Sequence, residues 1–405
     1  MRSRSEGSRR PPPGVAGREE AASLSILLKP VSGRCNLACR YCFYREVAER
    51  RSTGDYGLME PGTAELLVDR AFETGASHIS FGFQGGEPTL AGLDFFRRFV
   101  GRVRRGTEEA KAAGRGIEVN LALQTNGLLI DEAWATFLAG EGFLVGVSID
   151  GPRLLHDSLR IGRDGSGSHA AAMRGVSILR EAGVPVNALC VVDALTAGNA
   201  ARVYAHLREK GFDWLQFIPC LDPPGEEGGH TWSLTPEDYG SFLAETFDLR
   251  YGEWRRGSRV NVRWFDDLVG MAMGNPPESC GMRGFCGSSL AVESDGSAYT
   301  CDFYMTDEWK LGDIRRDSIA AMLGSPAARR FVDRSRRIDP ACAACPAFSL
   351  CRGGCLRYRE PFADGRPSLN RYCSSFKRFF GHATPRLLEM AACEKTAADE
   401  SSSRA

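Results

Sequence analysis

The sequence lacks an excess of charge of either sign. Its 405 residues include 51 basic and 51 acidic side chains, so the formal net charge at pH 7 is zero. A chain without net positive charge has no general electrostatic attraction for nucleic acid or for an anionic membrane surface. We therefore expect neither nucleic acid nor a membrane among its partners.

Long apolar runs are also missing, since no stretch approaches the roughly 20 residues that span a bilayer. Residues 1–22 contain three consecutive prolines and many polar side chains, but no hydrophobic region of the kind that an export signal requires. This segment is predicted to be a disordered tail. The 14 cysteines lie in uneven groups, which fits metal ligation in a reducing compartment better than a disulfide framework, so a cytoplasmic location is predicted.

Strand and helix patterns alternate over the first half of the chain. Six strands are predicted, at Leu24–Leu28, His78–Phe83, Ile117–Leu123, Phe143–Ile149, Val186–Val192 and Trp214–Ile218. Helices are predicted between them, near Pro61–Thr74, Leu93–Arg105, Asp131–Gly140, Ala170–Ala182 and Asn199–Lys210. Such alternation implies a parallel sheet with right-handed crossovers. Six units predict an α/β fold, a partial (β/α)6 TIM-type barrel whose active site lies at the carboxyl ends of the strands.

The barrel is predicted to occupy residues 23–235. A linking helical segment follows at 236–262, then a cysteine-rich domain at 263–375 and a C-terminal helix and tail at 376–405. Within the cysteine-rich domain, two short apolar pieces on either side of a Ser-Asp-Gly-Ser turn predict a hairpin.

Three cysteines near the start of the chain carry the most specific chemical signal. Cys35, Cys39 and Cys42 follow a C-x3-C-x2-C pattern on one short segment. A cubane of four irons needs four ligands, so three thiolates leave one iron open to a cofactor or substrate. A zinc site that lacks one ligand, or chance, is the alternative.

A second group of cysteines lies in the C-terminal third of the chain. Its eight members are Cys280, Cys286, Cys301, Cys342, Cys345, Cys351, Cys355 and Cys373. Eight thiols make two sets of four, which suit zinc or iron-sulfur clusters equally well. Spacing alone groups Cys342 to Cys355 together. Cys190, Cys220 and Cys393 are left over and are interpreted as incidental.

The cysteine triplet, with an aromatic residue before its third member, resembles the radical S-adenosylmethionine superfamily, and the second group resembles the SPASM extension of these enzymes. The resemblance is closer to the anaerobic sulfatase-maturating enzymes. It rests on the segments Leu28–Pro30, Cys42–Tyr44, Phe83–Leu93, Leu123–Gly127, Leu189–Val192, Leu215–Ile218, Cys220–Pro223 and Cys301–Tyr304. Such enzymes oxidise a Cys or Ser side chain, in a Cys/Ser-x-Pro-x-Arg motif of an unfolded sulfatase, to Cα-formylglycine.

This resemblance implies three [4Fe-4S] clusters, S-adenosylmethionine, and an electron donor of the flavodoxin or ferredoxin type. The radical cluster would be held by the triplet, whose open iron binds the cofactor. The nearer SPASM cluster would be held by Cys280, Cys286, Cys301 and Cys355. The distal cluster would be held by Cys342, Cys345, Cys351 and Cys373.

Several polar and glycine residues at strand ends are candidate contacts for the cofactor. Gly85, Gly86 and Glu87 would lie at its amino group, because glycines permit close approach and a carboxylate accepts from an ammonium. By the resemblance, Ser148 would bind its ribose or carboxylate. For Glu87 the alternative is a structural role in the turn that ends the strand. For Ser148 it is a role in the turn before Gly151 and Pro152.

Tyr44, Gln84 and Asp302 are the candidate residues on the substrate side. Tyr44 and Gln84 would hold the backbone of the peptide, although Tyr44 has packing as an equal alternative. Asp302 follows a cysteine ligand directly and is the candidate general base, with a turn-capping carboxylate as its alternative.

Two other functions stay open on the sequence. One is a SPASM-type peptide maturase that forms thioether or other crosslinks. The other is a zinc-stabilised scaffold without catalytic activity.

Overall fold

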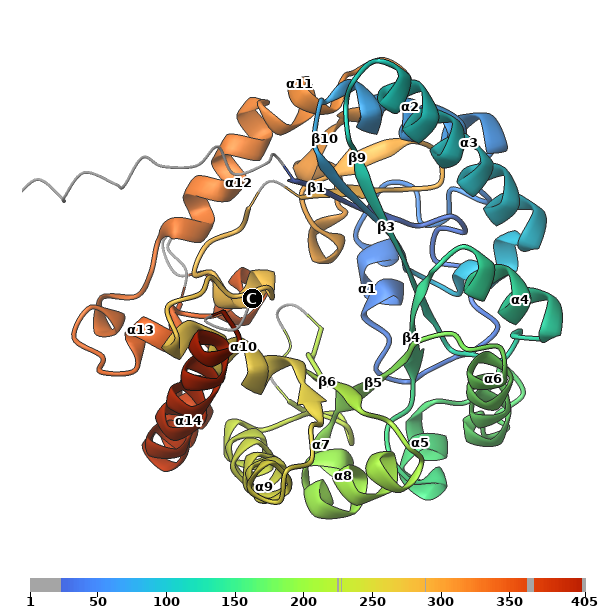
Figure 1. Ribbon diagram of the computed structural model, residues 1–405. Helices are drawn as coiled ribbons and strands as arrows, with labels where there is room; N and C mark the ends of the chain where they lie inside the picture. The colour runs from blue at the N-terminus through green and yellow to red at the C-terminus, as the bar shows by residue number, and fades with distance from the viewer. Residues whose placement is uncertain (1–22, 224–225, 227, 288, 363–367, 403–405) are drawn as a thin grey trace, which may run out of the picture.

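The computed structural model describes residues 23–402 except 224–225, 227, 288 and 363–367 (Figure 1). The predicted N-terminal tail, residues 1–22, lies outside the described residues, as do the last three residues of the predicted C-terminal tail.

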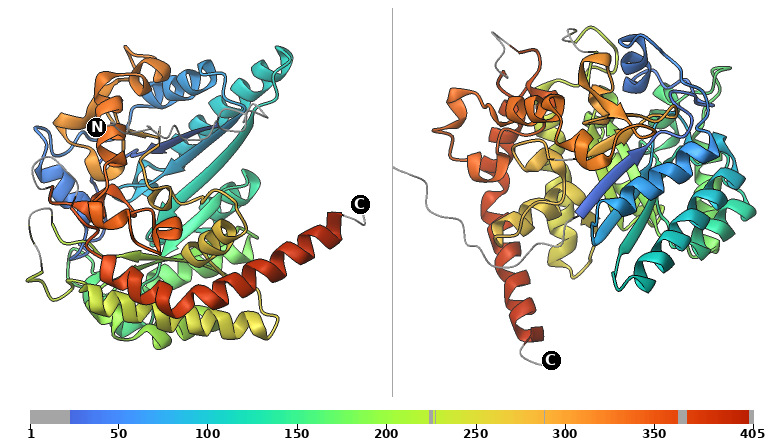
Figure 2. Two further views of the ribbon diagram at one scale, coloured as in Figure 1. Left: turned by 90° about the vertical axis from the view of Figure 1, so that its left-hand side faces the viewer. Right: turned by 90° about the horizontal axis from the view of Figure 1, so that it is seen from above.

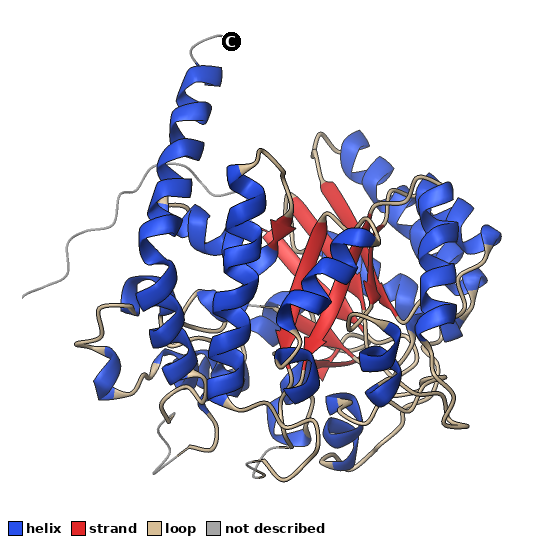
Figure 3. Cartoon of the chain, turned by 90° about the horizontal axis from the view of Figure 1, so that it is seen from below, coloured by secondary structure: helices blue, strands red, loops and turns tan. Residues whose placement is uncertain are grey.

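Six parallel strands form the centre of the fold, in the order β1-β2-β3-β4-β5-β6. Their bounds are β1 Ser23–Leu28, β2 His78–Phe83, β3 Glu118–Thr125, β4 Leu144–Ser148, β5 Val186–Val192 and β6 Trp214–Pro219. Helices cover the outer side of the sheet (Figure 1, Figure 3). The predicted partial barrel is therefore confirmed.

The alternation within β2 shows how each strand separates core from site. Phe81 and Phe83 point outward, where their ring centroids lie 5.1 and 5.0 Å from that of Phe99 on helix α3 Leu93–Ala112. Gly82 lies between them at a position of the inner face, because successive positions of a strand alternate between the two faces. With no side chain there, it leaves space inside the barrel near the polar residues that follow the strand.

The helices of the barrel are α2 Pro61–Glu73, α3 Leu93–Ala112, α4 Glu132–Gly140, α6 His169–Glu181 and α8 Ala200–Glu209. Three shorter helices were not predicted, α1 Phe43–Glu49, α5 Arg153–Leu159 and α7 Ala194–Ala197. The prediction ended α3 at Arg105, which was too early. Gly106 lies inside this helix. A Cβ there would lie 3.1 Å from the ring of Phe72, so the glycine permits close packing between α3 and α2.

The segment after the barrel contains a helix and also a short strand. Helix α9 Pro236–Arg255 begins at Thr235, whose hydroxyl accepts a hydrogen bond from the amide of Asp238 at 3.1 Å. Strand β7 Asn261–Val262 then pairs in parallel with β6, and α10 Arg263–Ala272 follows. Helix α9 packs along the C-terminal helix α14 Cys373–Ser402 (Figure 2).

The predicted hairpin of the cysteine-rich region is present and continues the barrel sheet. Strands β8 Leu290–Val292, β9 Ser297–Tyr299 and β10 Lys310–Asp313 are antiparallel neighbours, while β8 pairs in parallel with β1. The sheet therefore has ten strands in the order β10-β9-β8-β1-β2-β3-β4-β5-β6-β7. Helices α11 Ile319–Leu323, α12 Pro326–Arg336 and α13 Phe348–Cys351 complete this region.

Across the described residues, the helices are too short or too polar for any of them to traverse a lipid bilayer.

Candidate active site

The loop that carries the cysteine triplet follows β1 and is held by the segment after α5. The amides of Ala38 and Arg40 donate to carbonyls in segment 159–161, at 2.8 and 3.0 Å. The guanidinium of Arg163 donates twice to the carbonyl of Cys35, at 3.0 and 2.9 Å. No pattern in the sequence indicates this support, because the supporting residues follow a different strand.

Burial raises the pKa of Cys35 to about 12 and also raises that of Cys39, against the opposing charge of Arg160. Thiols that resist ionisation alone become thiolates when they bind iron. Arg160 is 8% exposed and donates to the hydroxyl of Tyr41 at 2.8 Å, so it supplies a fixed positive charge beside the loop. Three thiolates on one loop next to a buried cation fit an anionic iron-sulfur cluster.

Gly85 and Gly86 bring the end of β2 against the cysteine loop. A Cβ at Gly86 would lie 2.1 Å from the carbonyl oxygen of Arg34, and φ at Gly86 is +59°. A Cβ at Gly85 would lie 2.4 Å from Cε of Lys29. Only glycine permits both contacts, so these two positions set how closely strand and loop approach.

The Glu87 carboxylate is 1% exposed and joins the ends of β2 and β3. Its Oε1 accepts from the amide and hydroxyl of Thr89, at 3.1 and 2.6 Å, and from the hydroxyl of Thr125 at 2.7 Å. Its Oε2 accepts from the amide of Asn126 at 2.7 Å. The geometry shows the turn role, and the contact with the cofactor stays a prediction.

Asn126 is a residue that the sequence interpretation missed. Its side-chain amide donates to Oδ1 of Asn36 at 2.7 Å and lies 3.9 Å from Sγ of Cys35. The Gln-Thr-Asn-Gly run after the third strand was the available signal.

Ser148, the last residue of β4, is half-buried at the same end of the barrel. Asp150, two residues later, is 1% exposed and accepts a hydrogen bond from the Tyr41 hydroxyl. Its Oδ1 accepts from the amide of Val191 at 2.8 Å. Asp150 therefore anchors the aromatic residue of the cysteine motif to β4 and β5, a role that the sequence did not indicate.

The structure brings together the three residues predicted on the substrate side. The Tyr44 hydroxyl donates to Oδ2 of Asp302 at 3.3 Å. The amide of Gln84 donates to the same hydroxyl and to Oδ2 of Asp302 at 3.4 Å. Burial raises the pKa of Asp302, while the charge of Lys29 opposes this shift. A proton acceptor thus lies beside two hydrogen-bonding side chains from two other elements.

An aromatic contact joins the cysteine loop to the cysteine-rich region. Phe43 directly follows Cys42, and Phe303 lies two residues after Cys301. Their ring centroids are 4.7 Å apart. The two cysteine-bearing segments therefore face each other across the Tyr44 group.

The cysteines of the C-terminal region form two groups in space. Burial raises the pKa of Cys355, and the nearby charges of Cys280 and Cys286 raise it further. Burial also raises the pKa of Cys301, with added effects of Asp302 and then Cys355. A Cβ at Gly281, the residue after Cys280, would lie 3.5 Å from Cβ of Cys355. Cys355 therefore lies with the early cysteines, which differs from the grouping by spacing alone.

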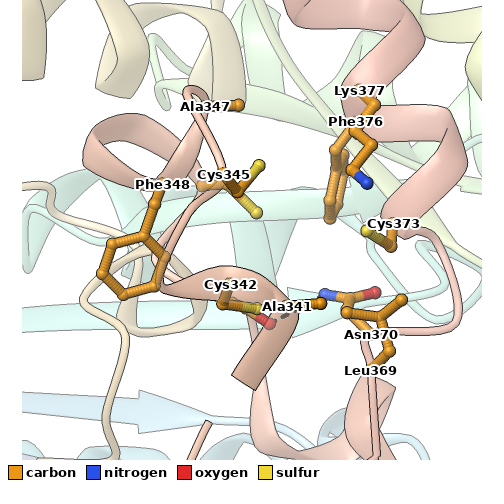
Figure 4. A pocket seen from close by; sticks show the side chains of 12 residues that line it. Ala341, Cys342, Cys345, Ala347, Phe348, Leu369, Asn370, Cys373, Phe376 and Lys377 are labelled. Carbon is orange, nitrogen blue, oxygen red and sulfur yellow. Dashed lines mark hydrogen bonds between the residues drawn. The ribbon is translucent and has the colours of Figure 1, made fainter. Parts of the chain in front are cut away.

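The second group surrounds one pocket (Figure 4). Four of its lining residues are Cys342, Cys345, Cys351 and Cys373. They come from three separate segments, the last of them the first turn of α14. Within the part of the chain that the structure describes, no three Cys, His, Asp or Glu side chains are arranged so that they could hold one metal ion together. Four thiols around a pocket fit a cubane, which is larger than one zinc ion.

Two family models match the chain. The radical SAM superfamily matches residues 30–199, and the iron-sulfur cluster-binding SPASM domain matches residues 280–346. The fold and the site therefore define a radical SAM enzyme with a SPASM domain, which uses iron-sulfur clusters and S-adenosylmethionine.

Full-length relatives narrow this class. A cysteine-type anaerobic sulfatase-maturating enzyme of Clostridium perfringens is 42% identical, over 91% of this chain and 98% of its own. A serine-type enzyme of Bacteroides thetaiotaomicron is 30% identical, over 90% of each chain. The structure of native anSMEcpe with bound AdoMet and Cp18Cys peptide matches with a TM-score of 0.86 and 40% identity, over 91% of this chain and 99% of that one. The chain belongs to the anaerobic sulfatase-maturating enzymes, which favours this function over the crosslinking maturase and the zinc scaffold.

Proposed function

We propose that this enzyme is of the cysteine type and oxidises a cysteine side chain of a sulfatase polypeptide to Cα-formylglycine without oxygen. Its identity is 42% with the cysteine-type enzyme of Clostridium perfringens and 30% with the serine-type enzyme of Bacteroides thetaiotaomicron. The observation that carries the proposal is the group of Tyr44, Gln84 and Asp302, which lies between two cysteine-bearing segments.

Three [4Fe-4S] clusters are held by the triplet and by the two groups of four cysteines. Cys280, Cys286, Cys301 and Cys355 hold one of these, and the four cysteines of the pocket hold another. When bound, the radical cluster and S-adenosylmethionine supply the oxidant that removes a hydrogen atom from the β-carbon of the target residue. Gly85, Gly86, Glu87 and Ser148 line the place of this cofactor at the carboxyl ends of β2 and β4.

Asp302 accepts the proton that leaves the thiol of the target. With ordinary pKa values of about 8.5 for a thiol and 3.9 for Asp, this transfer is uphill by roughly 6 kcal/mol. Burial raises the pKa of Asp302, so the mismatch is smaller in the site. Tyr44 and Gln84 orient the Asp302 carboxylate and hold the backbone of the peptide.

One further electron must then leave the target residue, and the cluster held by Cys301 and its partners, next to Asp302, would supply the acceptor. The thioaldehyde that results is hydrolysed by water, which provides the aldehyde oxygen and releases the sulfur as hydrogen sulfide.

The partner is an unfolded sulfatase segment with a Cys-x-Pro-x-Arg motif, and the reductant is a flavodoxin or ferredoxin. A cytoplasmic location is consistent with cysteines that form no disulfide among the described residues. A peptide partner is supported by the structure of native anSMEcpe, which contains a bound Cp18Cys peptide.

An anaerobic assay tests this function. Three peptides that differ only in Cys, Ser or Ala at the target position are incubated with reconstituted enzyme, reductant and S-adenosylmethionine, and the products are identified by mass spectrometry. We expect the aldehyde from the Cys peptide at a higher rate than from the Ser peptide, and none from the Ala peptide. Equal or faster conversion of the Ser peptide would contradict the cysteine type, and no aldehyde from either would contradict the proposed function.

A further inference from the structure

The Leu28–Pro30 motif contains a lysine to which the proposed reaction assigns no role. Lys29 directly follows β1 and is 1% exposed. Its Nζ lies 4.5 Å from the centroid of the Tyr44 ring. Its aliphatic stem occupies the space that a Cβ at Gly85 would fill, since that atom would meet Cε, Cγ and Cδ at 2.4, 2.9 and 3.1 Å.

A buried ion pair between Arg51 and Glu293 lies beside this lysine. Glu293 directly follows β8 and is 0% exposed. Its Oε2 lies 2.6 Å from Nη1 of Arg51 and 4.0 Å from Nζ of Lys29. Arg51 is anchored in turn, because it donates to the hydroxyl of Ser32 at 3.0 Å. Arg51 is thus the nearer of the two cations that pair with Glu293.

Lys29 pairs with Glu293 and contacts the Tyr44 group through the tyrosine ring. A buried ammonium is costly unless it is paired, and Glu293, whose Oε2 lies 4.0 Å from Nζ, is the ion-pair partner of Lys29. Burial lowers the pKa of Lys29, while the charges of Glu293 and, less strongly, Asp302 oppose that shift. The contact that links Lys29 to the Tyr44 group is the one between its ammonium and the face of the Tyr44 ring.

Tyr44 is therefore held from two sides. Its ring face lies against the ammonium of Lys29, and its hydroxyl is bound to Gln84 and Asp302. An ammonium over an aromatic face is attracted by the ring quadrupole, and the attraction is stronger where water is excluded. The junction of β1 and β8 thus supports the aromatic ring at the centre of the site.

We propose that Lys29 is a positioning residue for formylglycine formation, which holds the Tyr44 ring and, through the hydroxyl of Tyr44, the Asp302 carboxylate in register with the target side chain. This inference rests on the proposed function. Lys29 acts through Tyr44 and does not itself touch the peptide. Loss of Lys29 leaves the cysteine triplet intact, so it separates cofactor cleavage from product formation.

The test uses the full chain with Lys29→Met, which keeps a long apolar stem but removes the charge. We expect unchanged iron content and cofactor cleavage, while the ratio of formylglycine to 5'-deoxyadenosine falls by about 10-fold to 100-fold, the range for a misplaced catalytic group. The kcat for the peptide should fall, whereas its Kd, measured by fluorescence anisotropy without S-adenosylmethionine, should stay the same. Lys111→Met, in the exposed last turn of α3, is the matched control.

An unchanged product ratio in Lys29→Met would overturn the proposal. If Lys29→Met lost its iron, Lys29→Gln, which keeps a polar head without charge, would decide by the same ratio. In a Tyr44→Leu background, Lys29→Met should cause little further loss, because the ring it holds is gone. A full additional loss there would contradict action through Tyr44. Failure of the wild-type enzyme to form any aldehyde would instead contradict the proposed function.

Discussion

Two tyrosines, Tyr41 and Tyr44, lie on either side of Cys42 and make contacts with different parts of the molecule. Tyr41 is bound by Asp150 and Arg160 after the fourth strand. Tyr44 is bound by Asp302, 258 residues further along the chain. The two tyrosines are three positions apart, yet the hydroxyl of Tyr41 is bound to residues of the barrel and that of Tyr44 to Asp302 of the cysteine-rich region.

Asp302→Asn keeps the shape of the side chain and removes its basicity. We expect cofactor cleavage to persist while formylglycine formation falls by about two to four orders of magnitude, the usual effect of losing a general base. With a peptide deuterated at the β-carbon, deuterium should still reach 5'-deoxyadenosine, because hydrogen abstraction precedes the departure of the proton. Wild-type product yield, or loss of iron, would make Asp302 a bystander or a structural support.

At the scale of elements, loops that follow different strands support one another at the carboxyl end of the barrel. The glycines after β2 touch the cysteine loop, and the segment after α5 binds its backbone. Helix α5 is tied to β4 by His156, which is 1% exposed. Two predictions follow from these contacts between elements.

Gly86→Ala places a Cβ 2.1 Å from the carbonyl oxygen of Arg34, at a residue with φ of +59°. Because the atom in the way is backbone, the cysteine loop must move. We expect the variant to lose about four irons per chain and its cleavage of S-adenosylmethionine, and to retain the SPASM clusters. Gly92→Ala, also at positive φ but with nothing within 4 Å, is the control for backbone strain alone. Equal iron loss in both variants would show that strain, and not contact with the loop, is responsible.

His156 must be neutral in the folded protein. Its Nδ1 accepts from the amide of Asp150 at 3.2 Å, so the proton lies on Nε2, which faces the hydroxyl of Ser168 at 3.0 Å. Burial and then the charge of Arg160 lower its pKa to about 2, against an ordinary value near 6.5. The stabilisation is therefore complete above pH 6.5 and declines as the pH falls, because the unfolded chain takes up the proton first.

We expect the free energy of unfolding to fall by about 2 kcal/mol between pH 6.5 and pH 5 through this group. Chemical denaturation at several pH values measures it. The variant His156→Gln should lack this part of the slope, although it is less stable near neutral pH. Parallel pH profiles for the two proteins would show that His156 does not carry the effect.

At the scale of the whole molecule, the cysteine-rich region is built onto the barrel. Strand β8 pairs with β1, so both cysteine-bearing segments start from one sheet. The pocket lined by Cys342, Cys345, Cys351 and Cys373 lies against the first turns of α14 (Figure 4). The group of Tyr44, Gln84 and Asp302 is thus formed where the two regions meet, with members from both.

Single replacements separate the two SPASM clusters. Cys355→Ala should alter the same spectroscopic signal as Cys280→Ala, because these cysteines lie together in space. Cys342→Ala and Cys373→Ala should alter the other signal. Electron paramagnetic resonance of the reduced protein, with iron analysis, measures this. A signal shared by Cys355 and Cys342 would overturn the assignment. Solubility should fall in all four variants, because metals help to hold such regions together.

Patterns within one segment could be interpreted from the chain alone. The spacing of Cys35, Cys39 and Cys42 indicates an open cluster because all three thiols lie on one loop. The bounds of β2 and β5 were predicted correctly. Strands of a parallel sheet are covered by helices, so they appear in the sequence as short apolar runs with clear ends.

Contacts between distant segments were decided by the tertiary structure. The grouping of Cys355 with Cys280, the support of Tyr41 by Asp150 and the burial of Lys29 against Tyr44 all join different strands or regions. Separation along the chain does not limit proximity across a sheet, so spacing carries no record of such pairs. The pairing of β8 with β1 brings these parts to one site, because it places the end of the cysteine-rich hairpin beside the end of the first strand.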